Sequence, residues 1–461
     1  MSDQSTPPEA AAREDAYRLN AAVVDAILAA VEVEARPRLL ELLEPLHEAD
    51  IADLLEQISP SERQNLVSLW GRDFDGSVLS ELEEGVRDDI IDELEPEVLE
   101  TAVQDLETDD LVYLVEDLEE EDQAKVLDAL EAADRVAVEA SLQYEEDTAG
   151  RLMSREMVIV PPHWNVGEAI DHMRAHDDLP ETFYKVILAD AGMKVVGTVP
   201  LGTIMAHRRE TPLLSLADTD PRLIPVDQKD EDVAYAFNQY HMVSAPVVDA
   251  DGRLVGVITI DDAMDVLEDA AEEDMKRLAG LGDEELSDTV WETTVARFPW
   301  LVVNLATAII ASLVIAQFDD SIAAIVALAI LMPIVASMGG NAATQTLTVA
   351  VRALATRDLT TSNAGRIVRR EALVGLANGC AFAVIIGFVG SFWFGSPMLG
   401  VVIGVAMVIN MLVAGLAGIL VPMALDRVGA DPALASGTFV TTVTDVVGFL
   451  AFLGLATIVL T

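Results

Sequence analysis

Five long apolar segments follow Trp300, and they constrain the fold more than any other feature of the sequence. They cover residues 300–318, 322–351, 372–394, 399–425 and 436–461. A helix needs about 20 apolar residues to cross the hydrocarbon core of a bilayer, and these segments have that length. A helix of a soluble protein is rarely apolar on all sides over such a distance. The sequence therefore predicts a transmembrane domain of five helices over residues 299–461.

Charge is distributed as unevenly as hydrophobicity. The formal net charge is −51, and the residues after position 299 contribute only −1 of it. A surface as acidic as that of residues 1–299 repels phosphates, which argues against a nucleic-acid partner. We interpret most of these carboxylates as solvated surface of the kind found in proteins from a salty cytoplasm, and a minority as cation sites. The sequence alone does not separate the two groups.

Basic residues in the short connections predict the orientation of the spans. The connection between the second and third segments holds Arg352, Arg357, Arg366, Arg369 and Arg370. The connection between the fourth and fifth segments holds Arg427. The two other connections hold no Lys or Arg. Positive loops stay in the cytoplasm. We therefore expect a plasma-membrane protein with a cytoplasmic N-terminus, cytoplasmic soluble domains and an outer C-terminus.

A signal peptide is not expected at the start of the chain. The first apolar stretch, residues 21–33, is short, is interrupted by Asp25 and Glu32, and has no basic leader.

Asp445 is the single ionisable residue that lies well inside an apolar segment. It follows Thr441, Thr442 and Thr444 in the last segment. A carboxylate at the middle of a membrane helix costs roughly 2.5–3.5 kcal/mol, so such residues usually face a bundle interior or a water-filled path. We interpret Asp445 as facing an ion path, with Thr441 and Thr442 adding oxygens. The alternative is an aspartate whose hydrogen bonds only join two helices.

The second segment has an unusual centre. Pro333 and the pair Gly339-Gly340 are expected to interrupt the helix, and Asn341 follows them directly. Broken backbone at membrane depth is tolerated where it lines a cavity. Freed carbonyls and the Asn341 side chain would then hold water or a hydrated ion, which makes Gly339, Gly340 and Asn341 candidate pore residues. The alternative is close helix packing, which glycine also permits.

The soluble part divides into a helical region and two α/β modules. Residues 1–148 repeat leucine, valine and isoleucine at spacings of three and four, which predicts helical hairpins stacked into a small superhelix. Ser59 or Ser61 is the expected cap of one helix. Residues 149–212 and 213–267 each show strands around one helix, ending in the second module with a hairpin at 245–259. Residues 268–298 are predicted to form one acidic connecting helix.

The second module carries the run Val243-Ser244-Ala245-Pro246-Val247-Val248-Asp249, followed by Gly252-Arg253-Leu254-Val255-Gly256-Val257-Ile258-Thr259. This run resembles a CBS domain, and two such modules in tandem resemble a CBS pair. Resemblance to CBS pairs implies an adenine nucleotide such as ATP as ligand, held by Gly256, Thr259 and Asp262. The first module lacks the corresponding hydroxyl and Asp. The alternative is that Thr259 and Asp262 only cap the following helix.

The whole order of domains resembles the MgtE family of Mg²⁺ channels. The second span carries Met332-Pro333 and Met338-Gly339-Gly340-Asn341-Ala342, and the last span carries Thr441-Thr442, Thr444-Asp445 and Gly448-Phe449. The resemblance implies a homodimer in a lipid bilayer, with the pore on its axis and Mg²⁺ as both transported and regulatory ion. It also implies metal-binding roles for particular acidic residues: Asp445 in the pore, Asp431 at the cytosolic entrance, and Asp262, Asp265, Glu273, Asp274 and Glu231 as sensors.

Three positions depart from the family pattern. Ala343 stands where the family usually has Gly, His241 where it often has Asp, and Ala270 where it often has Glu. The first departure is expected to narrow or stiffen a loop after Asn341. The other two alter sensor positions, so the Mg²⁺ level that closes the gate does not carry over.

The function predicted from these features is Mg²⁺ uptake through a channel that closes when Mg²⁺ binds the acidic cytosolic domains. Mg²⁺ loses water reluctantly and prefers oxygen ligands, so we expect Asp445 to hold it through its water shell. The rivals are a CBS-regulated secondary carrier or exporter of divalent cations and a membrane-anchored nucleotide sensor. An enzyme is not expected, because the spans offer one carboxylate, no His and no pair of nucleophile and base.

Overall fold

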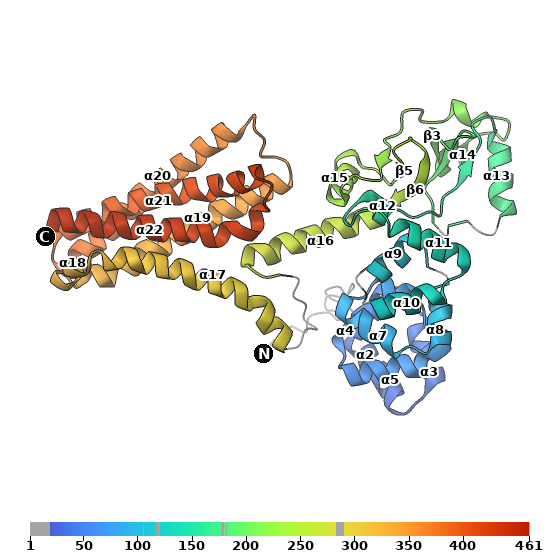
Figure 1. The fold of residues 1–461 in the computed structure, drawn as a ribbon, viewed down its shortest axis with the longest axis horizontal. Helices are drawn as coiled ribbons and strands as arrows, with labels where there is room; N and C mark the ends of the chain where they lie inside the picture. The colour runs from blue at the N-terminus through green and yellow to red at the C-terminus, as the bar shows by residue number, and fades with distance from the viewer. Residues whose placement is uncertain are drawn as a thin grey trace, which may run out of the picture. The chain divides into compact units, whose positions relative to one another are not determined.

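The structure, a computed structural model, describes residues 19–460 except 105, 117, 119, 177–178, 181 and 283–289. It divides into two compact units, Met1–Ala270 and Ala271–Thr461. The first eighteen residues of the expected helical domain lie outside the described residues. Figure 1 shows the elements of both units, and the fold class agrees with the prediction of helical domain, paired α/β modules and apolar helices.

The first part of the first unit is built from short helices, as predicted. They are α2 (Ala21–Glu32), α3 (Arg36–Leu43), α4 (Glu48–Gln57), α5 (Pro60–Trp70), α6 (Ser77–Ser80), α7 (Glu84–Glu93), α8 (Pro96–Ala102), α9 (Thr108–Glu116), α10 (Glu120–Ala129) and α11 (Ala132–Ser141). Ser59 is the N-cap of α5: its side chain accepts from Glu62 N–H while Glu62 accepts from Ser59 N–H at 2.9 Å. Leucine and valine from all these helices share one core.

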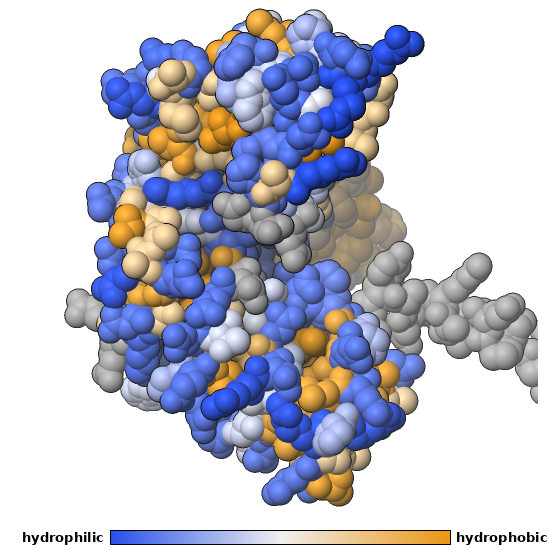
Figure 2. Space-filling model, turned by 90° about the vertical axis from the view of Figure 1, so that its right-hand side faces the viewer, coloured by the Kyte–Doolittle hydropathy of each residue, from blue (hydrophilic) through white to orange (hydrophobic). Residues whose placement is uncertain are grey.

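The two α/β modules have the same topology. The first contains α12 (Ala149–Leu152), β1 (Ile159–Val160), α13 (Val166–Ala175), β2 (Lys185–Ala189), β3 (Val195–Pro200) and α14 (Leu201–Ala206); the second contains β4 (Ile224–Pro225), α15 (Asp230–Tyr240), β5 (Ser244–Val248) and β6 (Leu254–Thr259). In each sheet the first strand is parallel to the second, and the second is antiparallel to the third. Bridges such as Ser154 to Val257 join the modules. Figure 2 shows mostly hydrophilic residues on the visible face of this unit.

Five helices of the second unit are long and apolar enough to cross a membrane, which confirms the predicted number. They are α17 (Val290–Ala316), α19 (Ala327–Ala355), α20 (Ala364–Phe394), α21 (Pro397–Arg427) and α22 (Pro432–Leu460). About 61% of the apolar window of α21 is buried, against 6% for α17, so α21 is central and α17 peripheral. Helices α19, α20 and α22 pack on α21, and α17 packs on α22.

Helices α20 and α21 approach each other backbone to backbone. A Cβ added at Gly375 would lie 2.6 Å from the Met411 carbonyl oxygen, and one added at Gly404 would lie 3.1 Å from the Ala383 carbonyl oxygen. Small residues at such positions let membrane helices pack closely. The two helices therefore form one tightly packed pair.

The predicted interruption of the second span at Pro333 and Gly339-Gly340 is wrong. Helix α19 runs without a break through all three residues, and the chain instead breaks at Ile325–Val326, between α18 (Asp319–Ala324) and α19. The reason is close packing, the alternative weighed above. A Cβ at position 339 would lie 2.2 Å from the Asn410 amide nitrogen of α21, which donates to the Val335 carbonyl at 2.8 Å.

The single connecting helix predicted over 268–298 is also wrong. Helix α16 (Ile260–Ala279) ends at Gly280, whose φ of +75° is left-handed, and α17 starts at Val290. Gly280 N–H bonds to the Arg277 carbonyl and Leu281 N–H to the Lys276 carbonyl, both at 2.9 Å. These two bonds form a Schellman motif, which stops a helix at a left-handed glycine. Residues 283–289 of the predicted helix lie outside the described residues.

Candidate functional site: an ion path and a carboxylate cluster

A cavity of about 380 Å³ lies among α17, α19, α22 and the end of α16, all within the second unit. Its polar lining consists of one carboxylate, one amide, one indole N–H and threonine hydroxyls, with a few small and apolar residues beside them. The lining residues are Leu278, Ala279, Trp300, Asn304, Thr307, Ala308, Thr344, Leu347, Thr348, Gly437, Thr438, Thr441, Thr442 and Asp445. The cavity has room for several waters.

The residues predicted from the last span meet in this cavity. Asp445, Thr441 and Thr442 all line it, and they lie toward one face of α22 because Asp445 follows Thr441 by four residues and Thr442 by three. Thr441 and Thr442 donate their hydroxyl protons to the carbonyls of Gly437 and Thr438. Their oxygens keep lone pairs for water or a cation. The arrangement offers oxygen atoms alone, the donor type that hard cations prefer.

The residues predicted from the second span divide into three different environments. Gly340 lies beside the path: a Cβ there would be 3.9 Å from Thr441 Cγ2. Gly339 instead packs against Asn410, away from the cavity. Asn341 is exposed on α19, with its amide nitrogen 3.5 Å from Ser337 Oγ. Asn341 belongs to a polar stripe on α19 that is exposed in the single chain: Ser337, Asn341, Thr344 and Thr348.

Two asparagines of the apolar helices were missed by the sequence reasoning. Asn304 of α17 lines the cavity and accepts a 2.8 Å hydrogen bond from Thr438 Oγ1. Asn410 is fully buried in α21, and Gly448 of α22 also lies against its amide group. The signal was present, because an uncharged amide inside an apolar span needs a partner as a carboxylate does.

Asp431, the residue predicted at the cytosolic entrance, lies next to the end of α16. Asp431 directly precedes α22, and its Oδ1 accepts from Ala433 N–H at 2.7 Å. Its Oδ2 is 2.8 Å from Arg277 Nη1, and Arg277 also pairs with Glu273 one turn earlier in α16. Asp274 lies in the same turn of α16 as Glu273. The Arg277 guanidinium therefore lies between two of the predicted metal ligands, Glu273 and Asp431.

A second group of acidic residues gathers inside the first unit, where the helical domain meets the α/β modules. Carboxylate oxygens of Glu107, Asp109 and Glu156 lie within 4.8 Å of one another. We call these three residues the carboxylate cluster. Glu156 is held by Thr108 Oγ1 at 2.7 Å and by Ser154 Oγ at 2.8 Å. Three carboxylates at this spacing fit a divalent ion, whose oxygen ligands they could supply.

Electrostatics link the predicted sensor residues of α16 to this cluster. Burial, followed by the charge of Asp262, raises the pKa of Asp109 and brings that of Asp110 to about 6. Burial and the charges of Asp262 and Glu81 raise the pKa of Asp265 to about 6. Sequence reasoning found Asp262 and Asp265 but missed their neighbours on α9, although the run Glu107-Thr108-Asp109-Asp110 is visible in the sequence. Glu231 lies on a different element, exposed in the first turn of α15.

Within the cluster the pKa values of the two glutamates are shifted in opposite directions. Burial and the neighbouring Glu156 raise the pKa of Glu107 to about 7. Burial acts to raise the pKa of Glu156 as well, but hydrogen bonds from Thr108 and Ser154 outweigh it and lower that pKa. A divalent cation would favour the charged form of Glu107 against burial and against the repulsion from Glu156, because metal ions displace protons from carboxylates.

These raised pKa values predict that acid stabilises the first unit when Mg²⁺ is absent. The stability gained by protonating Glu107 is complete below its ordinary pKa of 4.5 and is lost as the pH rises through about 7. Protonation of Asp110 and of Asp265 also stabilises the unit, and this contribution is lost as the pH rises through about 6. Glu156, with a lowered pKa, loses its contribution only in more acid solution. We expect calorimetry of the full chain in EDTA to give a Tm for this unit about 3 °C higher at pH 5.5 than at pH 8. A flat profile would contradict the pKa assignment.

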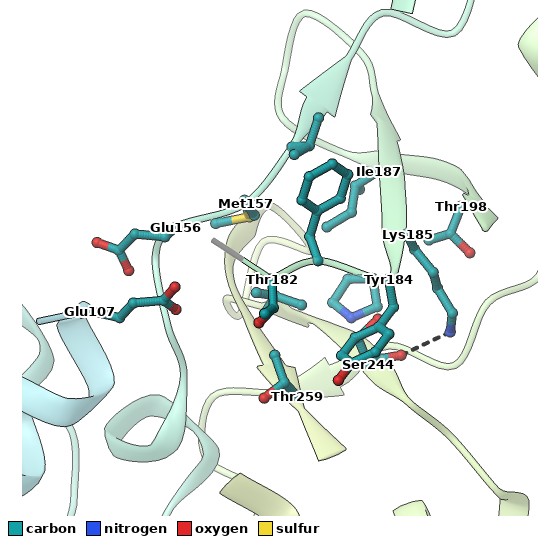
Figure 3. A pocket seen from close by; sticks show the side chains of 14 residues that line it. Glu107, Glu156, Met157, Thr182, Tyr184, Lys185, Ile187, Thr198, Ser244 and Thr259 are labelled. Carbon is teal, nitrogen blue, oxygen red and sulfur yellow. Dashed lines mark hydrogen bonds between the residues drawn. The ribbon is translucent and has the colours of Figure 1, made fainter. Parts of the chain in front are cut away.

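A pocket between the two α/β modules is the candidate nucleotide site. It is lined by Glu107, Glu156, Met157, Val158, Thr182, Phe183, Tyr184, Lys185, Ile187, Thr198, Ser244, Pro246, Val257 and Thr259. Lys185 donates to the Ser244 carbonyl at 2.9 Å, and in Figure 3 Glu107 and Glu156 lie together at the opposite edge. Aromatic rings, one cation and several hydroxyls give it the mixed lining of a ligand pocket.

Of the three predicted nucleotide residues, only Thr259 lines this pocket. Asp262 accepts from Thr259 N–H and Thr259 Oγ1, both at 2.8 Å, at the start of α16. This is the helix-capping role that the sequence left open. Gly256 packs against Met153, whose Sδ would lie 2.6 Å from an added Cβ.

Comparison with known proteins gives a consistent picture over most of the chain. Residues 46–147 match the MgtE intracellular N domain, residues 149–210 and 215–269 match the CBS domain, and residues 332–455 match the divalent cation transporter family MgtE. The chain is 34% identical to the magnesium transporter MgtE of Enterococcus faecalis over 319 residues, which are 69% of this chain and 70% of that protein. The chain belongs to the MgtE family.

Two further relatives extend this finding to other parts of the MgtE family. The chain is 35% identical to the magnesium transporter MgtE of Thermus thermophilus over 330 residues, 70% of this chain and 72% of that protein. A crystal structure of the cytosolic domain of the Mg²⁺ channel MgtE in complex with ATP is 28% identical, with a TM-score of 0.50. That likeness covers 53% of this chain and 99% of the solved one. Membership of this transporter family and the five apolar helices make the chain a multi-pass membrane protein.

The departures from the MgtE pattern have defined places in the structure. Ala343 is buried within helix α19, and its carbonyl oxygen would lie 2.7 Å from a Cβ added at Gly418. It therefore packs against α21, and the expected loop after Asn341 is not there. His241 ends α15 in the left-handed region at φ +53°, and Ala270 lies within α16.

Proposed function

We propose that this chain forms a channel for Mg²⁺ uptake and that Asp445 faces the ion path. The observation that carries the proposal is the cavity in the apolar unit, where a single carboxylate is surrounded by threonine hydroxyls and one amide. Oxygen ligands and room for water suit an ion that keeps most of its hydration shell. With the orientation expected from the arginine-rich connections, the membrane potential draws the ion inward by about 2.3 kcal/mol per charge per 100 mV.

The polar stripe on α19 supports a homodimeric channel. Ser337, Asn341, Thr344 and Thr348 are exposed in the single chain, although they lie in an apolar helix. Thr344 and Thr348 border the cavity, whereas Ser337 and Asn341 do not. Polar groups facing lipid would be costly, so a partner or water is expected to cover Ser337 and Asn341. A second copy placed with its own stripe opposite would line a path with two copies of Asn341 and of Asp445. Two carboxylates on one axis favour a divalent over a monovalent ion by charge.

The carboxylate cluster supports closure by cytosolic Mg²⁺. Glu107 and Asp109 come from the helical domain, while Glu156 lies at the start of the first CBS module and Asp262 at the start of α16. Mg²⁺ held between them would keep these parts together. Loss of Mg²⁺ would leave like charges facing one another, which biases a two-state element toward an open form. This regulation would lower Mg²⁺ uptake when the Mg²⁺ concentration in the cytosol is high.

Flux measurements on reconstituted protein test the proposal. Proteoliposomes would be loaded with a fluorescent Mg²⁺ indicator and a Mg²⁺ buffer set to a low or a high internal level, and external Mg²⁺ would then be added. We expect influx at low internal Mg²⁺ and its suppression at high internal Mg²⁺. Absence of influx in both conditions would favour the exporter or the nucleotide sensor. Influx that requires the gradient of a second, coupled ion would favour a secondary carrier.

The pocket between the CBS modules supports ATP as a regulatory ligand. A relative's cytosolic domain was solved with ATP, and this pocket pairs aromatic residues with Lys185. We expect ATP to raise the Tm of the wild-type first unit and to have a much weaker effect on Lys185→Met. Lys194→Met is the matched control, since Lys194 is exposed and is not among the lining residues. An equal ATP effect in all three proteins would exclude this pocket as the site.

A further inference from the structure

The end of α16 forms part of the wall of the ion path. Leu278 and Ala279 line the cavity, and Leu278 packs on a small cluster made by Leu347 and Val351 of α19 and Ala433 of α22. The Leu278 carbonyl oxygen would lie 3.6 Å from a Cβ added at Gly437. The contact thus joins the last turn of α16 to the first turns of α22.

Helix α16 ends at Gly280, and two observations explain why this position holds a glycine. Gly280 is left-handed, and a Cβ there would also collide with the indole nitrogen of Trp300, only 1.7 Å away. Trp300 belongs to α17 and lines the same cavity. The position of Arg277, one turn before this glycine, is therefore fixed by backbone geometry as well as by its own contacts.

Arg277 is the cation of this contact. Its guanidinium lies between Glu273 of its own helix and Asp431 of the connection before α22, with Nη1 2.8 Å from Asp431 Oδ2. The other Asp431 oxygen accepts the Ala433 N–H, so the carboxylate is oriented by the start of α22. Side chains of Arg277 and Asp431 are 35% and 28% exposed, so the pair is only partly screened by water. We call this three-residue arrangement the Arg277 bridge.

We propose that the Arg277 bridge holds the end of α16 at the entrance of the ion path without a metal ion. This inference rests on the proposed function and changes the role expected for Glu273 and Asp431. The guanidinium of Arg277 neutralises these two carboxylates, and Mg²⁺ has to displace it in order to bind them. A planar guanidinium with several N–H donors can serve two carboxylates at once. Removal of the guanidinium leaves two carboxylates that repel each other and push α16 away from α22.

Influx at low internal Mg²⁺ measures this effect directly. We expect Arg277→Gln to raise that influx about fivefold, the upper end for a partly exposed ion pair. High internal Mg²⁺ should restore closure, because the freed carboxylates can then bind the metal. Arg427→Gln is the matched control: it makes the same change of charge, and Arg427 is the exposed last residue of α21, just before the connection that contains Asp431. Equal influx in the two variants would overturn the proposal.

A double-mutant cycle identifies the partner. Asp431→Asn keeps a side-chain oxygen for the Ala433 N–H but removes the charge. Arg277→Gln should then have little further effect in the Asp431→Asn background, because the bridge is already lost. An undiminished effect of Arg277→Gln in that background would show that Arg277 acts elsewhere and would overturn the proposal.

Cross-linking tests the contact without relying on transport. A Leu278→Cys, Gly437→Cys pair would be built in a Cys380→Ser background, which removes the single native thiol. In EDTA the pair should form a disulfide readily with Arg277 present and about fivefold more slowly with Arg277→Gln. Unchanged cross-linking would overturn the proposed role of the Arg277 bridge, even if the protein transports Mg²⁺ in the influx assay. If Arg277→Gln slows cross-linking but the protein transports no Mg²⁺, the Arg277 bridge is supported and the proposed channel function is not.

Discussion

Asp445→Asn is expected to reduce Mg²⁺ influx at low internal Mg²⁺ by at least about tenfold. A carboxylate about 5 Å from a divalent ion attracts it by roughly 2–6 kcal/mol, depending on how much water lies between them, and 1.4 kcal/mol corresponds to a factor of ten. The amide keeps the size and one acceptor oxygen of the side chain but loses the charge. The measurement is the indicator-loaded proteoliposome assay, normalised to the amount of folded protein.

Asp426→Asn is the matched control for this experiment. Asp426 is an exposed carboxylate in the last turn of α21 and is not among the residues that line the cavity. We expect its influx to stay close to that of the wild type. A folded Asp445→Asn protein with undiminished influx would remove Asp445 from the ion path, and an equal loss in both variants would point to the charge of the whole unit instead.

Gly339→Ala is expected to destabilise the bundle although it adds only one methyl group. The new Cβ would lie 2.2 Å from the Asn410 amide nitrogen, and Asn410 is fully buried, with Gly448 of α22 packed against the same amide group. Asn410 therefore has no room to retreat and would lose its hydrogen bond to the Val335 carbonyl. Overpacking of this kind costs about 1–3 kcal/mol, which corresponds to a fall in Tm of about 5 °C in detergent.

The neighbouring glycine supplies the control. A Cβ at Gly340 would meet only Thr441 Cγ2, at 3.9 Å, so Gly340→Ala should leave the Tm within about 1 °C of the wild type. Asn410→Ala should relieve part of the damage in the Gly339→Ala background, because the two changes share one contact. Equal effects of the two alanines would contradict the packing seen around Asn410.

Sequence patterns were sufficient wherever one periodicity or one composition dominated. The apolar segments located the five long helices, and the predicted hairpin at 245–259 located β5 and β6 of the second CBS module. Patterns failed where a local signal had two physical outcomes. Gly339-Gly340 could break a helix or admit a neighbour, and only the position of Asn410, seventy residues further along the chain, decides between them.

The candidate sites show the same limit. Asp445 was found because a lone carboxylate in an apolar helix is expensive, a property of that residue alone. Glu107, Asp109 and Glu156 were missed because each is ordinary among so many acidic residues, and only the fold brings them within 4.8 Å. Gly280 is an intermediate case. A glycine three residues after Arg277, with Lys276 and Arg277 in the last turn, is a recognised helix stop. The acidic run before it nevertheless suggested one continuous helix.

The close pairing of α20 and α21 has a practical consequence for observing the channel in operation. Backbones that touch through glycines leave little space for one helix to slide along the other, so this pair can serve as a fixed frame of reference. Cys380, the single cysteine, is exposed on α20 within that pair. A spin label or fluorophore there needs no other thiol to be removed. Changes in its distance to a second label on α22 would then report displacement of α22, since the frame itself stays still.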